Sequence, residues 1–153
     1  MDLHLDDRLL HGRILHGWAP VLRPARVLLV SPALADARGR ALYAEAGAEL
    51  DAALRFLAPG GEPPPAPAPG DFWLTDAPGG ARWLLASGLA VARLVIIGLR
   101  EAGGRALAED LRAGAATLAR LDDLAAAGVE ILHQPFPGGP ARTLRSLLAG
   151  DHA

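Results

Sequence analysis

The chain has 153 residues, of which 51% are hydrophobic and 21% charged, a composition typical of one globular domain with a substantial apolar core. Its 15 basic residues, all arginine, stand against 17 acidic ones, so it lacks the basic excess of a nucleic-acid-binding protein. Cysteine is absent, which excludes disulfides, thiolate metal sites, iron–sulfur clusters and a cysteine nucleophile.

The sequence offers no good candidate for a membrane span or a secretory signal. Its longest apolar stretch, 83–99, is interrupted by Arg93 and by two glycines, and so falls short of about 18 uninterrupted apolar residues. The N-terminus carries acidic residues where a signal peptide has a basic start and an apolar run. We therefore expect a cytoplasmic protein.

Short apolar runs alternate along the chain with longer helical patterns, which is the layout of a mainly parallel sheet covered by helices on both faces. We expect a single α/β domain over residues 1–150, built on an open sheet of about six strands. The expected strands are 1–5, 26–30, 72–75, 93–98, 115–118 and 129–133.

Two sets of apolar residues recur every four positions and predict helices that face the sheet. They are Leu10, Ile14, Trp18 and Leu22, and then Leu42, Ala46, Leu50 and Leu54. Further on, Asp76 with Pro78 predicts a helix start and Gly88 its end. Gly114 is expected to end the next helix, Asp122 to open a short one, and residues 141–148 to form the last.

Residues 59–70 contain six prolines and three glycines, so they cannot pair in a sheet. We expect an exposed loop within the domain. A ligand for a small adaptor domain is the alternative function of such a segment.

Ligands of parallel sheets gather at the carboxyl ends of the strands, and the segment after the first strand is the richest in chemistry. It contains Asp6, Asp7, Arg8, His11, Gly12 and Arg13. Arginine and a helix start can hold a phosphate, a neutral imidazole can attack phosphorus, and glycine lets an anion approach the backbone. A polar loop without chemistry remains the alternative.

The two adjacent acids also allow two interpretations. Asp6 and Asp7 form either a carboxylate pair or Mg²⁺ site, or a turn in which they orient the backbone. The glycine-rich nucleotide-binding motifs and the G-x-S-x-G motif of α/β-hydrolases are absent from the sequence. A P-loop is excluded because the chain has no lysine.

The run Asp-Asp-Arg-Leu-Leu-His-Gly-Arg-Ile-x-x-x-Trp over residues 6–18 resembles the signature of one protein family. This family comprises the IIB components of the mannose/fructose/sorbose class of the bacterial phosphoenolpyruvate-dependent sugar phosphotransferase system. Weaker similarity extends over 26–36, 94–98 and 128–137. The resemblance implies a mainly parallel α/β fold with helices on both faces.

The resemblance also implies a function. His11 would accept a phosphoryl group, on Nδ1, from a phosphohistidine of a IIA partner and pass it to a sugar bound by the membrane components IIC and IID. Arg8 would neutralise phosphate charge, and Asp6 and Asp7 would order the loop or fix the imidazole tautomer. No metal or organic cofactor is implied, and the protein would be peripheral to the membrane through IIC and IID.

Several positions depart from the family pattern. Arg13 replaces a glutamine, and the rim differs at Ser31, Pro32, Ile96, Leu99 and Arg100. An alanine-rich helix and the proline-rich loop stand where the family has its third strand. These changes raise the alternative of a IIB-like regulatory or interaction module that binds phosphate or a partner without serving a sugar transporter. The sugar and the oligomeric state stay open.

Overall fold

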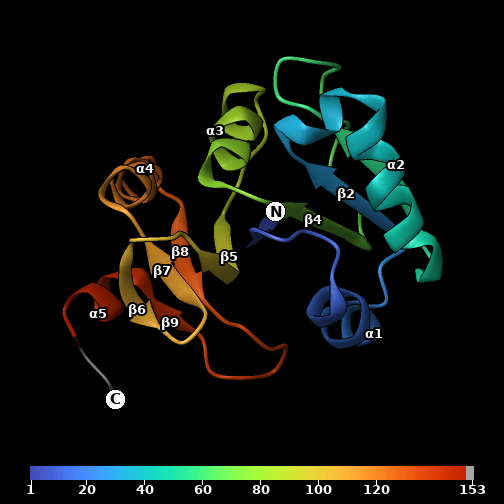
Figure 1. Cartoon of the computed structure of the whole chain (residues 1–153). Helices are drawn as coiled ribbons and strands as arrows, with labels where there is room; N and C mark the ends of the chain where they lie inside the picture. Colours follow the sequence, from blue (N-terminus) through green and yellow to red (C-terminus); the bar gives the residue numbers. More distant parts are fainter. Residues whose placement is uncertain (151–153) are drawn as a thin grey trace.

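The computed structural model describes residues 1–150, which form one α/β domain around a nine-stranded sheet (Figure 1). Its strands are β1 (Asp2–Asp6), β2 (Arg26–Val30), β3 (Ala53–Leu57), β4 (Asp71–Thr75), β5 (Arg93–Arg100), β6 (Arg105–Ala108), β7 (Leu111–Ala113), β8 (Glu130–His133) and β9 (Arg142–Thr143). The order is β3-β2-β4-β1-β5, after which the first half of β5 pairs with β8 and its end with β7. Within the described residues, the pairs β6–β7 and β8–β9 are antiparallel and the other pairs are parallel.

Helices cover both faces of this sheet, as expected. They are the π-helical segment η1 (Arg13–Trp18), α1 (Ala19–Leu22), the short 3₁₀ segments η2 (Pro32–Ala35) and η3 (Gly47–Glu49), α2 (Ala37–Ala46), α3 (Pro78–Ala86), α4 (Ala115–Ala126) and α5 (Leu144–Leu148). Buried residues of α3, α4 and α5 belong to one core, and those of η1 and η2 belong to the other, against which α2 packs.

Alternation along the strands supplies both cores. In β1, Leu3 and Leu5 enter the core beneath α3, while His4 points to the opposite face and contacts the rings of Trp18 and Phe72. The same alternation in the other central strands explains why their sequences are apolar throughout.

Five of the six expected strands are confirmed, with ends that differ by at most two residues. The strand expected at 115–118 is wrong, because these residues begin α4. Gly114 precedes that helix instead of ending one, and Asp122 lies inside it. The helix expected before Gly114 is also wrong, since 105–113 form the β6–β7 hairpin.

The hairpin has a physical cause in two glycines. Gly103 has a φ of +76°, which favours glycine. A Cβ on Gly104 would lie 2.6 Å from the carbonyl carbon of Ala113, so the two strands of the hairpin need a glycine there to approach. The turn of the hairpin then places Glu109 and Asp110 between its strands.

The helix expected through Leu54 is wrong as well. α2 ends at Ala46, its Leu42 is 61% exposed, and Leu54 lies in β3. β3 pairs with β2, so the chain does have a third strand where the sequence predicted a helix and a loop. Residues 59–70 form neither helix nor strand and are mostly exposed.

Of the two remaining helices, one is confirmed and the other is shifted at one end. α3 begins at Pro78 and ends before Gly88, as expected. α5 begins at Leu144, three residues later than the predicted 141. In the first helical segment, Leu10, Ile14 and Trp18 are buried, but Leu22 is 44% exposed and lies outside the buried stripe.

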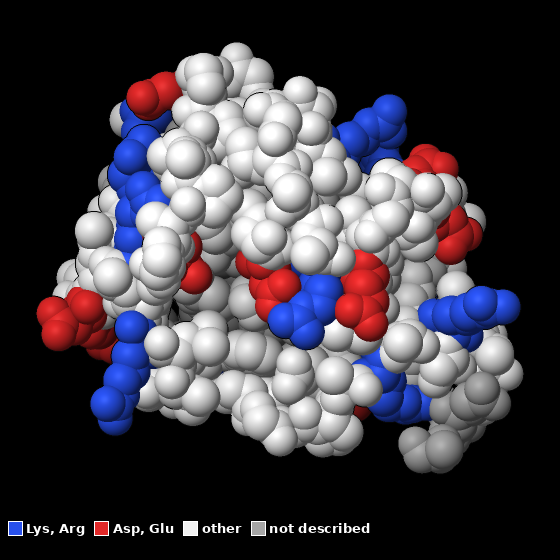
Figure 2. Space-filling model, turned by 180° about the vertical axis from the view of Figure 1, so that it is seen from behind, with Lys and Arg blue, Asp and Glu red and all other residues white. Residues whose placement is uncertain are grey.

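Figure 2 shows the back of the molecule, where most of the surface is uncharged and the arginines are scattered, several of them beside acidic groups. This face carries no continuous basic stripe of the kind that tracks a phosphate backbone.

Candidate functional site

The loop that follows β1 lies at the carboxyl ends of the parallel strands, at the point in the sheet where the strand order reverses. After β1 the chain crosses to β2 on one side, and after β5, the neighbour of β1, it passes through β6, β7 and α4 to β8 on the other side. Such a switch point, at the carboxyl ends of parallel strands, is where open α/β sheets bind ligands. The backbone N–H of Asp7 donates to the carbonyl of Gly98, so the loop is anchored to β5.

Asp6 is fully buried and organises this loop. Its Oδ1 accepts a hydrogen bond from the backbone N–H of Arg8, and its carbonyl accepts one from Leu9, whose φ of 52° marks a tight turn. Its Oδ2 lies 2.8 Å from Nε2 of His11. Burial acts to raise the pKa of Asp6, but the contacts with His11 and with the Arg8 N–H outweigh it and hold that pKa below its usual value.

His11 presents its two ring nitrogens to different surroundings. Nε2 is buried against Asp6 in a contact that is close but not linear. Nδ1 accepts a hydrogen bond of 3.4 Å from the backbone N–H of Arg13, and the side chain is 16% exposed. A carboxylate favours the tautomer with its proton on the near nitrogen, so Nε2 carries the proton and Nδ1 keeps its lone pair.

Arg8 and Arg100 flank the two acids. The Arg8 side chain is 47% exposed, with its Nε 3.7 Å from Oδ1 of Asp6. Arg100 is bound more firmly, because its backbone N–H and its Nη1 each donate to Asp7 at 2.6 Å, and Nη1 also lies 3.5 Å from Asp6. Arg100 thus belongs to the site itself.

Arg13 reaches the β6–β7 turn. Its Nη1 donates to Oδ2 of Asp110 at 2.9 Å, and its guanidinium lies 4.6 Å from the ring centroid of Phe136. Nη2 of Arg100 lies 3.7 Å from the other oxygen of Asp110. The structure therefore brings together Asp6, Asp7, Arg8, His11 and Arg13, with Gly12 exposed between them, and adds Arg100, Asp110 and Phe136.

Asp110 and Phe136 were missed by the sequence reasoning. No local motif marks Asp110, and its place depends on the hairpin, which the sequence did not predict. Phe136 follows the Gln-Pro segment after β8 and is 55% exposed, so an exposed aromatic beside a strand end was the available signal.

Three residues expected at the rim are buried instead. Ile96 and Leu99 are buried in the core, so the expectation that they form a docking rim is wrong. Ser31 is buried too, where its hydroxyl donates to Asp76 at 2.6 Å and accepts from the N–H of Ala33. Pro32 is exposed.

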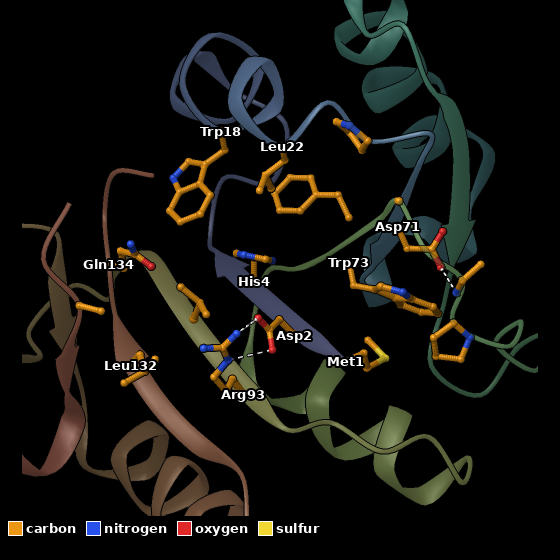
Figure 3. Close-up of a pocket in the computed structure, with 17 residues that line it drawn as sticks. Met1, Asp2, His4, Trp18, Leu22, Asp71, Trp73, Arg93, Leu132 and Gln134 are labelled. Atoms are coloured by element: carbon orange, nitrogen blue, oxygen red, sulfur yellow. Dashed lines mark hydrogen bonds and ion pairs between the residues drawn. The ribbon is translucent and has the colours of Figure 1, made fainter. Parts of the chain in front are cut away.

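The other histidines within residues 1–150 lie outside the loop, although His133 is close enough to Asp110 and Arg13 for their charges to act on it. His16 is 71% exposed and 3.8 Å from Glu49. His133 is buried, and burial lowers its pKa, with Asp110 acting in the opposite direction. His4 lines a cavity of about 660 Å³ near the start of β1, together with Trp18, Leu132 and Gln134 (Figure 3). This cavity does not include His11.

Comparison with solved structures gives the fold a close parallel. The chain superposes on the IIB domain of the sorbose permease from Klebsiella pneumoniae with a TM-score of 0.82 and 18% identity, over 98% of this chain and 96% of that one. For manxB from Thermoanaerobacter tengcongensis the TM-score is 0.81 with 17% identity, covering 100% and 96%. For the N-acetylgalactosamine-specific IIB component 1 from Escherichia coli it is 0.79 with 18% identity, covering 93% and 97%.

No family model and no curated protein matches the sequence. The match in structure nevertheless defines a class: this is a single α/β domain with a mostly parallel open sheet. More particularly, it has the fold of the IIB domains of the sugar phosphotransferase system. Within residues 1–150, no helix is long and apolar enough to cross a membrane.

Proposed function

We propose that the protein is a phosphocarrier that accepts a phosphoryl group on Nδ1 of His11. The observation that supports this most directly is the pairing of Nε2 with the buried carboxylate of Asp6 at 2.8 Å. It favours an unprotonated Nδ1, whose lone pair accepts only a long 3.4 Å hydrogen bond from the N–H of Arg13 and gives it up when Nδ1 acts as the nucleophile.

The transfer step balances without a cofactor. The lone pair of Nδ1 attacks the phosphorus of a donor phosphohistidine, the new N–P bond forms, and the N–P bond to the donor breaks with its electron pair returning to the donor ring. The proton on Nε2 stays beside Asp6, whose charge stabilises the ring as it becomes cationic. In transfer to a sugar, the hydroxyl oxygen attacks phosphorus and loses its proton to water, and the N–P bond breaks with its electron pair returning to Nδ1.

The surrounding charges suit this chemistry. Phosphoryl transfer depends chiefly on positioning and on electrostatic stabilisation of the moving group. Arg8 is partly exposed and free to turn towards an incoming phosphoryl group, while Arg13 and Arg100 hold further positive charge at the same edge.

The donor and acceptor are proposed from the fold shared with IIB domains of sorbose and N-acetylgalactosamine systems. A IIA domain carrying a phosphohistidine would supply the group at the cytoplasmic face of the membrane. A sugar bound to IIC and IID components would receive it. The resemblance of residues 6–18 to the IIB signature supports the same assignment.

The test is intact mass, before and after mild acid, of protein incubated with phosphoenolpyruvate, enzyme I, HPr and a IIA domain of this class. Wild type should gain one acid-labile phosphoryl group and His11→Ala none. His16→Ala, which removes an exposed histidine outside the loop, is the matched control and should be labelled like wild type. No adduct on wild type from a charged donor would overturn the proposal in favour of a regulatory module.

A further inference from the structure

The turn between β6 and β7 places one carboxylate between two arginines. Asp110 binds Arg13 at 2.9 Å through Oδ2 and lies 3.7 Å from Arg100 through Oδ1. The side chains of Arg13 and Asp110 are each 19% exposed. Asp110 therefore lies between two guanidinium groups at the edge of the sheet that carries His11, and of these only Arg100 is also bound by Asp7.

Arg100 has an unused donor at this point. Within residues 1–150, no group accepts a hydrogen bond from its buried Nη2. The guanidinium folds back over Gly98, and the hydrogen bond from its Nη1 to Asp7 at 2.6 Å holds it there. A buried donor without an acceptor is unfavourable, and an anion with more oxygens than a carboxylate would satisfy it.

Arg13 is held by more than Asp110. Its guanidinium also lies over Phe136, a cation–π contact that keeps it in place if the carboxylate leaves. A phosphoryl group carries about −1.5 to −2 charges and three acceptor oxygens, so it is a stronger partner for paired arginines than a carboxylate.

We infer that Asp110 occupies, while the site is empty, the position between Arg13 and Arg100 that a phosphoryl dianion takes when it binds. The carboxylate and the dianion therefore compete for both arginines. The inference deepens the proposed function, on which its application to phosphorylated His11 rests. When the phosphoryl group arrives, Asp110 gives up the arginines and the hairpin turn is released from the loop after β1. If Asp110 only fixed the hairpin turn, removing its charge would not change how tightly the arginines bind phosphate.

The first experiment titrates the unphosphorylated protein with inorganic phosphate, followed by NMR. Asp110→Asn removes the competing charge and should tighten phosphate binding roughly tenfold, the size expected for one charge-assisted hydrogen bond. Glu109→Gln is the matched control, because it makes the same change in net charge at an exposed neighbour in the same turn. Equal tightening in both variants, or weaker binding in Asp110→Asn, would overturn the inference.

Two further variants keep the test valid if Asp110→Asn alone fails to fold. Asp110→Ser should reproduce the gain, since it also lacks the charge. In an Arg13→Gln background the gain from Asp110→Asn should shrink, because one of the two contested arginines is gone. An undiminished gain in that background would contradict competition for Arg13.

The second experiment separates free phosphate from the phosphoryl group on His11. With a charged donor at equilibrium, the phosphorylated fraction of Asp110→Asn should rise relative to Glu109→Gln. Tighter phosphate binding without this rise would assign the site to free phosphate and overturn the assignment to His11. If no variant is ever phosphorylated, the proposed function fails, while the phosphate titration still decides the competition.

Discussion

The burial of His4 beneath Trp18 predicts how the free energy of unfolding depends on pH. Its side chain is 9% exposed and lies in edge-to-face contact with Trp18 at 5.2 Å and Phe72 at 4.7 Å. Burial lowers the pKa of His4 from 6.5 to about 4, against a smaller raising effect of the Trp73 backbone. The folded protein therefore keeps this imidazole neutral at a pH where the unfolded chain protonates it.

The sign and size of the effect follow from this difference. Between pH 6.5 and pH 4 the unfolded state binds more protons, so stability falls as the pH falls. The loss attributable to His4 is about 2 kcal/mol between pH 7 and pH 5, and about 3 kcal/mol by pH 4. The lowered pKa of Asp6 also destabilises the fold in acid, but chiefly below about pH 4, beneath this range.

The perturbation is His4→Leu, which replaces the imidazole with an apolar side chain of similar size. Urea unfolding at pH 7, 6 and 5 should be followed by circular dichroism, because His4 touches Trp18 and would alter its fluorescence. The wild type should lose about 2 kcal/mol more than the variant between pH 7 and pH 5. His16→Leu, at an exposed position, is the control and should behave like wild type. Equal losses in wild type and His4→Leu would refute the reasoning.

Three further predictions concern the loop and its supports. Asp6→Asn removes the charge that orients His11, so the rate of phosphoryl uptake measured by intact mass should fall roughly 10 to 100-fold; an unchanged rate would contradict this role. Gly98→Ala should cost about 1 kcal/mol in urea unfolding, because the new Cβ displaces the flexible end of Arg100 from its hydrogen bond to Asp7, and the cost should vanish in an Arg100→Ala background. Trp18→Phe loses the 3.1 Å hydrogen bond from Nε1 to a loop carbonyl after β8, so its free energy of unfolding should drop by about 1 kcal/mol. No drop in urea unfolding would show that the bond is dispensable.

The sequence was most informative where side chains differ in kind from their neighbours. The central strands β2, β4 and β5 begin at Arg26, Asp71 and Arg93, and their interiors are apolar on both faces, so their positions could be predicted closely. The dense polar run after β1 could be recognised as a candidate site for the same reason, since charged residues directly follow a buried strand.

The prediction failed where alanine dominates. In 42–54 and 105–118, small apolar residues satisfy a helical and a strand-like pattern about equally, so periodicity alone does not choose between them. The outcome depends on distant contacts: β3 forms because β2 offers it a free edge, and β7 forms because the end of β5 does. No window of local sequence contains that information.

Asp6 and Asp7 have different partners in the site because their side chains point to different sides of the chain. Consecutive residues at the end of β1 point to opposite sides, so Asp6 is buried against His11 while Asp7 reaches sideways to Arg100 at the end of β5. Arg100 then touches Asp6 as well, at 3.5 Å, and approaches Asp110 in the hairpin turn. Neither acid can replace the other, because exchanging their roles would require the strand to turn over. The same arginine therefore links the orientation of the imidazole to the position of the hairpin, and a change of charge on His11 has a short, continuous path of ion pairs to the turn that carries Asp110.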